Sequence, residues 1–240
     1  MPYFNIVAET SENTVVTEYE PVKKRSDSYQ SEAELEQEFI RLLCEQGYEY
    51  LPIHTEKDLI ANLRKKLEEL NNYQFSDTEW DDFFKNAVAN PNEHIVEKTR
   101  KIQEDNVQVL TRDDGSSKNI TLIDKKNIHN NRLQVINQYA VSTDDGAKHD
   151  NRYDVTVLVN GLPLVHIELK RRGVAIREAF NQINRYQRES FGAGSGLYEY
   201  IQIFVISNGT NTKYYSNSTR RNAEKENEKK GSSKTKTSNS

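Results

Sequence analysis

The stretch NRYDVTVLVNGLPLVHIELKRRGVAIREAFNQINRY, residues 151–186, decides the fold. Two apolar, β-rich runs at 154–159 and 164–169 flank Asn160-Gly161, a dipeptide that strongly favours a tight hairpin turn. A helical pattern follows over 174–190. The stretch therefore predicts a strand–turn–strand–helix unit.

Charged residues occupy the ends of the two predicted strands. Asp154 opens the first strand, and Glu168-Leu169-Lys170 closes the second. Side chains alternate along a strand, so Glu168 and Lys170 point the same way while Leu169 enters the core. Two converging carboxylates repel each other, and a divalent cation with hard oxygen ligands, such as Mg²⁺, relieves that repulsion. A neighbouring lysine can stabilise an attacking hydroxide, so the group suits phosphodiester hydrolysis.

The hairpin register tests this arrangement. Asp154 faces Glu168 only if paired positions sum to an even number, whereas a strict two-residue Asn160-Gly161 turn pairs Val159 with Leu162, an odd sum. We therefore predict either a three-residue loop with a bulge at Gly161 or a bend in the strand at Asp154.

These residues resemble a known family. The pattern Asp154…Glu168-Leu169-Lys170 looks like the PD-(D/E)xK nuclease signature, and Gln182-x-x-x-Tyr186 looks like the QxxxY motif of RecB-like members. Over roughly residues 27–219 the sequence is similar to the N-terminal nuclease domain of type I restriction endonuclease R subunits (HsdR), in particular the type IC group. The flanking similarity includes DSYQSE at 27–32, KTRKI at 98–102 and FVISNGT at 204–210.

The resemblance implies a fold and a set of metal ligands. The fold would be an α/β restriction-endonuclease-like core, a mixed central sheet flanked by helices, with a helical N-terminal part. Asp154, Glu168 and the backbone carbonyl of Leu169 would bind Mg²⁺, and Lys170 would position or activate the nucleophilic water.

It also implies supporting residues around the metal. Gln182 and Tyr186 are one helical turn apart and share a face, and in this family the pair supports the site and touches DNA. The first helix of such nucleases often presents a glutamate to the site. Glu36 is the tentative candidate here, with Glu32 second.

The charge distribution agrees with a polyanionic partner. The 240 residues carry a net charge of −4, but six basic residues and one acidic residue fall between Lys170 and Arg188. Arg171, Arg172 and Arg185 are expected to contact the phosphates of double-stranded DNA because they flank the proposed metal site. The alternative is an ordinary solvated helix face.

The rest of the chain divides into three parts. Residues 1–26 are weakly patterned and expected to be poorly ordered, 27–219 form the endonuclease domain, and 220–240 are a low-complexity tail expected to be disordered. Helices are predicted from Ser31 to about Gly47, and over 56–70, about 76–84 and 93–102; further strands are predicted over 107–110, 120–123, 132–141, 200–207 and 212–215.

Several features of the sequence argue against other classes of protein and other kinds of site. No apolar run approaches the ~20 residues of a membrane span, and residues 1–26 lack a secretory signal pattern, so a cytoplasmic protein without membrane contact is expected. The single cysteine, Cys44, excludes an internal disulfide and is expected in the core. The glycine-rich segment 192–196 follows a helix and precedes a strand, so we interpret it as a connector rather than a phosphate loop. His166 is expected to pack or hydrogen bond rather than bind metal.

The sequence also departs from complete R subunits. Those continue into two helicase-type motor domains, whereas no GxxxxGK[ST] phosphate loop occurs here. ATP use is therefore expected only through motor domains outside these residues, and contact with the methylation and specificity subunits only through the full-length R subunit. Two other hypotheses stay open: a DNA-binding or docking module that is inactive alone, and a nuclease directed at RNA.

Overall fold

The computed structural model describes residues 3–9, 15–20, 30–141 and 151–217. Two short strands, β1 (Tyr3–Glu9) and β2 (Val15–Glu20), pair antiparallel within the segment whose sequence showed little pattern. The predicted tail at 220–240 lies outside the described residues.

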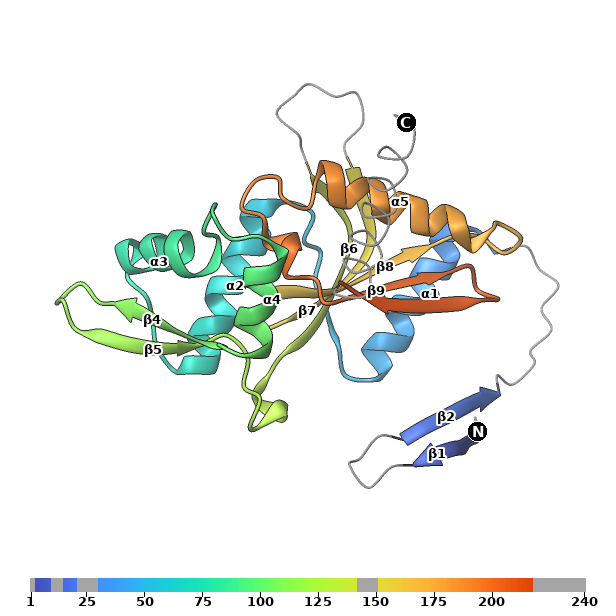
Figure 1. The fold of residues 1–240 in the computed structure, drawn as a ribbon, viewed down its shortest axis with the longest axis horizontal. Coiled ribbons are helices and arrows are strands. Elements are labelled where there is room, and N and C mark those ends of the chain that lie inside the picture. Colours follow the sequence, from blue (N-terminus) through green and yellow to red (C-terminus); the bar gives the residue numbers. More distant parts are fainter. Residues whose placement is uncertain (1–2, 10–14, 21–29, 142–150, 218–240) are drawn as a thin grey trace, which may run out of the picture.

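A six-stranded mixed sheet forms the centre of the molecule, as predicted (Figure 1). Its order is β10-β9-β8-β7-β6-β3. The pairs β6–β7, β7–β8 and β9–β10 are antiparallel, and β8–β9 and β3–β6 are parallel. The strands are β3 (Glu49–Tyr50), β6 (Leu133–Val141), β7 (Asn151–Val159), β8 (Leu162–Leu169), β9 (Ile203–Ser207) and β10 (Thr212–Ser216).

Helices cover both faces of the sheet. Helix α1 (Glu32–Glu45) lies on one face, where Leu35, Phe39 and Leu43 pack against valines of β6 and β7. Helices α2 (Glu56–Asn71) and α5 (Ile176–Glu189) contribute to the larger core on the other face. Each face of the sheet is therefore buried, which explains why its central strands are rich in apolar residues.

The predicted helix starts are confirmed. Ser31 with Glu34 forms a capping box at α1, and Ser76 with Glu79 forms another at α3 (Asp77–Phe83), which continues as a π-helical turn, Phe84–Val88. Helix α4 (Ile95–Gln103) completes the helical N-terminal part. Cys44 was expected in the core but is exposed, because the buried stripe of α1 passes to one side of it.

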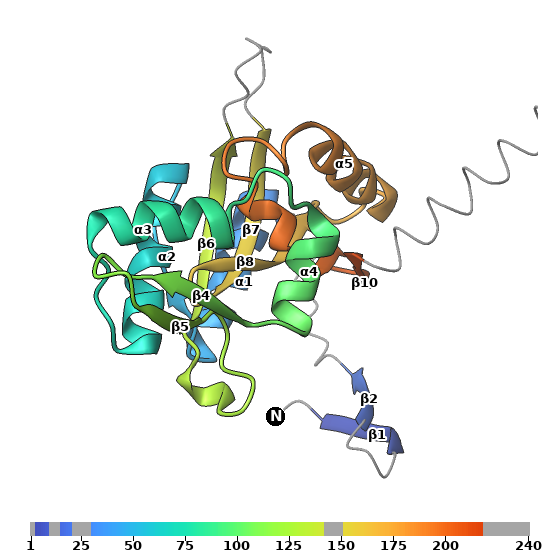
Figure 2. The ribbon, with the colours of Figure 1, turned by 60° about the vertical axis from the view of Figure 1, so that its left-hand side comes forward.

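A small antiparallel pair, β4 (Val107–Thr111) and β5 (Ser117–Thr121), lies beside α2 and α3, away from α5 (Figures 1 and 2). The connection after β5 contains a 3₁₀ turn, Ile128–Asn130. The strand predicted over 200–207 is shorter than expected. Leu197–Tyr200 forms a 3₁₀ turn instead, because Gly196 adopts a φ of 64° and Tyr200 turns inward to donate a hydrogen bond to the carbonyl of Val88.

The predicted three-residue hairpin loop is wrong. Asn160 and Gly161 form a two-residue turn, with φ angles of 52° and 84°, and Val159 pairs with Leu162. The Asn160 side chain fixes this turn by accepting a hydrogen bond from the backbone N–H of Arg132 and donating one to the carbonyl of Leu122. The register changes farther from the turn, where β8 has one extra residue at Leu164, so that Val155 pairs with Ile167.

The alternative prediction, a bend in the strand at Asp154, does not account for the register either, because the extra residue at Leu164 sets it; the side-chain pattern of β7 nevertheless reverses at Asp154. Tyr153 belongs to the core on the α5 face, whereas Val155, two residues on, belongs to the core on the α1 face. Regular alternation would place both on one face. Opposite Asp154, Gln138 of β6 adopts a left-handed φ of 51°, so both strands reverse their side-chain pattern at the same level.

Candidate active site

The hairpin brings Asp154 and Glu168 to the same point on the sheet. Continuing the Val155–Ile167 pairing by one residue places them opposite each other. An Asp154 carboxylate oxygen accepts a 2.8 Å hydrogen bond from the backbone N–H of Leu169. The Glu168 side chain is fully buried, and Lys170 donates to its Oε1 over 3.0 Å. The structure therefore assembles Asp154, Glu168 and Lys170 into one cluster.

Both carboxyl groups hold protons more tightly than usual. Burial and, to a smaller extent, the charge of Glu168 raise the pKa of Asp154 to about 7. Burial also raises the pKa of Glu168 to about 7, against the opposing effect of Lys170. A pair of carboxyl groups with raised pKa values favours the binding of an added positive charge, because that charge stabilises both carboxylates.

Lys170 remains positively charged at neutral pH. Burial lowers the pKa of its ammonium group, but the charges of Glu168 and Asp154 outweigh burial, and the net pKa is raised. A protonated lysine cannot accept a proton. It can donate hydrogen bonds to an attacking water or stabilise negative charge that develops nearby.

The donor set fits a hard divalent cation. Among the described residues no group of three or more His, Cys, Asp or Glu side chains could hold a metal. Mg²⁺ needs fewer protein ligands, because it usually keeps several waters and binds through one or two carboxylates. The Glu168 Oε2 atom is buried and has no hydrogen-bond partner among the described residues, so it has a lone pair to offer.

Gln182 and Tyr186 connect helix α5 to the strand that carries Asp154. The Gln182 amide donates to the Tyr186 hydroxyl, which donates in turn to the carbonyl of Arg152 over 2.7 Å. Burial, followed by the charge of Glu168, raises the pKa of Tyr186 to about 12, so this hydroxyl stays protonated. The pair lies beside the carboxylates and holds α5 in place against β7.

The two candidate glutamates of α1 occupy different places. Glu36 is buried, and its carboxylate oxygens accept hydrogen bonds of 2.6 Å from the side-chain amides of Asn137 and Gln138. It therefore holds the irregular part of β6 opposite Asp154. Glu32 accepts a 3.2 Å hydrogen bond from the backbone of Arg171, and its charge raises the pKa of Glu168. Glu32 is thus electrostatically linked to the carboxylate cluster.

The candidate DNA-contacting arginines lie at the surface around this cluster. Arg171 and Arg172 follow β8 directly and are exposed. Arg185 is exposed on α5, with its guanidinium 5.4 Å from the centre of the Tyr186 ring. Arg171 and Arg172 thus belong to the segment that follows Lys170, and Arg185 belongs to the helix that carries Gln182 and Tyr186.

His166 was expected to pack or to hydrogen bond, and the packing role is confirmed. It is fully buried and touches the rings of Tyr153, Tyr186, Phe191 and Phe204 edge-on. Neither ring nitrogen has a hydrogen-bond partner among the described residues. Gln138 was missed, since a left-handed residue inside a strand leaves no signal in its side-chain type.

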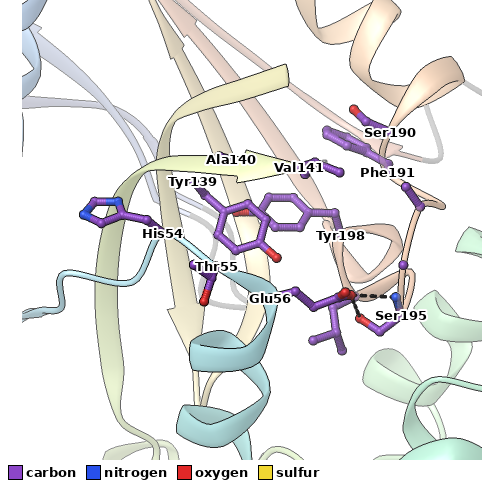
Figure 3. Close-up of a pocket in the computed structure, with 13 residues that line it drawn as sticks. His54, Thr55, Glu56, Tyr139, Ala140, Val141, Ser190, Phe191, Ser195 and Tyr198 are labelled. Carbon is purple, nitrogen blue, oxygen red and sulfur yellow. Dashed lines mark hydrogen bonds between the residues drawn. The ribbon is translucent and has the colours of Figure 1, made fainter. Parts of the chain in front are cut away.

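A separate cavity of about 260 Å³ opens beyond Tyr153, between β6, the start of α2 and the segment after α5 (Figure 3). Its aromatic walls include Tyr139 and Tyr198, and Glu56 lies at one side. Glu56 Oε1 accepts two 2.6 Å hydrogen bonds from Ser195, one from its N–H and one from its hydroxyl. A carboxylate bound to this glycine-rich segment disfavours a phosphate there, in agreement with the predicted connector.

A mixed sheet with Asp154, Glu168 and Lys170 at the ends of a hairpin, followed by a helix bearing Gln182 and Tyr186, defines a restriction-endonuclease-like α/β protein. The family model for the type I restriction enzyme R protein N terminus matches residues 29–223. The chain belongs to this family.

Relatives agree with this assignment. The chain is 50% identical over 216 residues to the type I restriction enzyme EcoprrI endonuclease subunit of Escherichia coli, a match that covers 90% of this chain and 68% of the relative. It is 42% identical over 194 residues to the SsaAORF53P endonuclease subunit of Staphylococcus saprophyticus, covering 79% of this chain but only 20% of that subunit. The chain thus spans about a fifth of the length of the staphylococcal relative.

No helix in the described part of the chain is long and apolar enough to cross a membrane.

Proposed function

We propose that this chain is the DNA-cleaving domain of a type I restriction enzyme R subunit and that it hydrolyses phosphodiester bonds in a Mg²⁺-dependent reaction. The observation that carries the proposal is the pairing of a half-buried Asp154 with a fully buried Glu168, whose pKa values are both raised to about 7 beside Lys170. The names of the relatives, which are endonuclease subunits, support it.

Each residue has a defined task in this proposal. Asp154, Glu168 and the backbone carbonyl of Leu169 would hold Mg²⁺, which when bound would supply Lewis-acid stabilisation of the scissile phosphate. The Lys170 ammonium would orient the attacking water and stabilise the negative charge that forms on it. The water oxygen would bond to phosphorus while its proton passes to solvent, and the bond from phosphorus to the leaving sugar oxygen would break while that oxygen takes up a proton from solvent, without a covalent enzyme intermediate.

The surrounding residues would hold the substrate and the strands. Arg171, Arg172 and Arg185 are exposed around the cluster and would contact phosphates of double-stranded DNA. Gln182 and Tyr186 would keep α5 against β7. Translocation driven by ATP, and contact with methylation and specificity subunits, would reside in the remainder of a full-length R subunit, and the proposed setting is the cytoplasm.

Calorimetric titration with Mg²⁺, together with a plasmid-nicking assay, tests the proposal on wild type and the Glu168→Gln variant. We expect wild type to bind the cation and to nick DNA, and the variant to lose both. Cation binding without nicking would favour the second candidate, a docking module that requires the rest of its subunit. A wild-type chain that binds no divalent cation would refute the proposed site, and competition by RNA would show whether DNA is the preferred substrate.

A further inference from the structure

His166 lies directly behind the carboxylate cluster, and no step proposed above uses it. It is two residues before Glu168 on β8, so both side chains point to the α5 face. Its ring is fully buried. It packs edge-on against four aromatic rings, Tyr153, Tyr186, Phe191 and Phe204. A phenylalanine would fill such a cage without burying polar atoms, so the nitrogens require an explanation.

The His166 ring lies against the carboxyl group of Glu168, and the charge of Asp154 also acts on it. The Nε2 atom of His166 is 3.5 Å from Oε2 of Glu168. Both atoms are buried, and neither has a hydrogen-bond partner among the described residues. A normal N–H···O bond is ~2.9 Å long, so a shift of well under 1 Å would satisfy both groups at once. The other carboxylate oxygen, Oε1, is already held by Lys170 over 3.0 Å.

The ring must be neutral to be tolerated in this cage. A ring fully buried among aromatic side chains is favoured in its neutral form, with one proton on one of its two nitrogens. The proton on Nε2 would face a carboxylate acceptor, whereas the proton on Nδ1 would face no acceptor among the described residues. The environment therefore favours the Nε2–H form.

We propose that His166 is a positioning residue, whose Nε2–H donates a hydrogen bond to Oε2 of ionised Glu168 and fixes the orientation in which this carboxylate meets a divalent cation. The role of His166 in cation binding rests on the proposed function, whereas the hydrogen bond itself does not. Donors behind a metal-binding carboxylate restrict its rotation and stabilise its charge, and losing one typically weakens metal affinity about 10- to 100-fold.

The hydrogen bond is tested first, on the unmodified 240-residue chain at pH 9, where Glu168 is ionised, by long-range ¹H–¹⁵N correlation spectra of its histidines. His166 is assigned by its loss in His166→Phe. We expect a protonated Nε2, and a change in its shift in Glu168→Gln. A protonated Nδ1 with a bare Nε2 would overturn the proposal, and this measurement needs neither metal nor activity.

The consequence for the metal is tested by Mg²⁺ calorimetry on two variants. His166→Phe keeps the aromatic packing but removes the donor, so its affinity should fall about 10- to 100-fold, while His166→Gln, whose amide can donate, should recover part of it. Phe191→Leu is the matched control, because it disturbs the same cage without touching a polar group. Equal Mg²⁺ affinity in wild type and His166→Phe would overturn the positioning role. A wild type with Nε2–H but no Mg²⁺ binding would refute the proposed function and the positioning role, leaving only the hydrogen bond.

Discussion

The raised pKa of Asp154 predicts that the metal-free protein loses stability as the pH rises. The ordinary pKa of 3.8 applies in the unfolded chain, and the folded value is about 7. Between these values the folded state binds more protons than the unfolded state. The free energy of unfolding therefore falls with increasing pH across this window, and the contribution present below pH 3.8 is lost by pH 7.

The size of the effect follows from the pKa difference. Each pH unit corresponds to about 1.4 kcal/mol, so the window from 3.8 to 7 amounts to about 4 kcal/mol for this one group. Between pH 5 and pH 8 the free energy of unfolding should fall by about 3 kcal/mol of these 4 kcal/mol, because the titration of Asp154 is complete near pH 7. Asp154→Asn removes the ionisation but keeps an oxygen to accept the hydrogen bond from the Leu169 N–H.

Urea unfolding at pH 5 and pH 8, without divalent cations, measures the change. We expect Asp154→Asn to gain about 3 kcal/mol of unfolding free energy relative to wild type on going from pH 5 to pH 8. Mg²⁺ at pH 8 should restore wild type and leave the variant unaffected. The exposed Asp81→Asn serves as control and should show no such difference. A wild-type-to-variant difference that is the same at both pH values would show that Asp154 is not held in the buried, repulsive environment described.

Two further changes test the frame around the site. Tyr186→Phe removes the hydroxyl that joins Gln182 to the Arg152 carbonyl. It should lower the free energy of unfolding in urea by about 1 kcal/mol and reduce DNA nicking. Unchanged values in both assays would contradict the bridging role. Gly161→Ala places a Cβ atom 2.6 Å from the Leu63 Cα at a φ of 84°. It should lower the free energy of unfolding by at least about 2 kcal/mol more than Gly115→Ala, where the φ of 80° is similar but the space is open. Equal losses in the two variants would show that helix α2 does not pack on this turn.

The sequence alone determined the local elements and the chemistry of the site. Apolar runs on either side of Asn160-Gly161 specified the hairpin, and Ser31 with Glu34 specified the start of α1, because turn and capping preferences act over a few residues. Carboxylates at the ends of two paired strands indicated a divalent cation, although pairing alone does not determine whether the two side chains share a face.

Only the tertiary structure decided how the strands meet and what surrounds the carboxylates. The even register of Asp154 and Glu168 arises from an extra residue at Leu164, which the sequence does not mark, and the turn itself is held by contacts with Arg132 and Leu122 from distant segments. The cage around His166 is built from four elements, β7, β9, α5 and the segment after it.

The raised pKa values of Asp154 and Glu168 depend on the same packing. Desolvation is a property of every atom within several ångströms of a group, so it follows from which elements pack together. Sequence spacing therefore pointed to the carboxyl groups, whereas burial by residues far away along the chain determines how tightly these groups hold their protons.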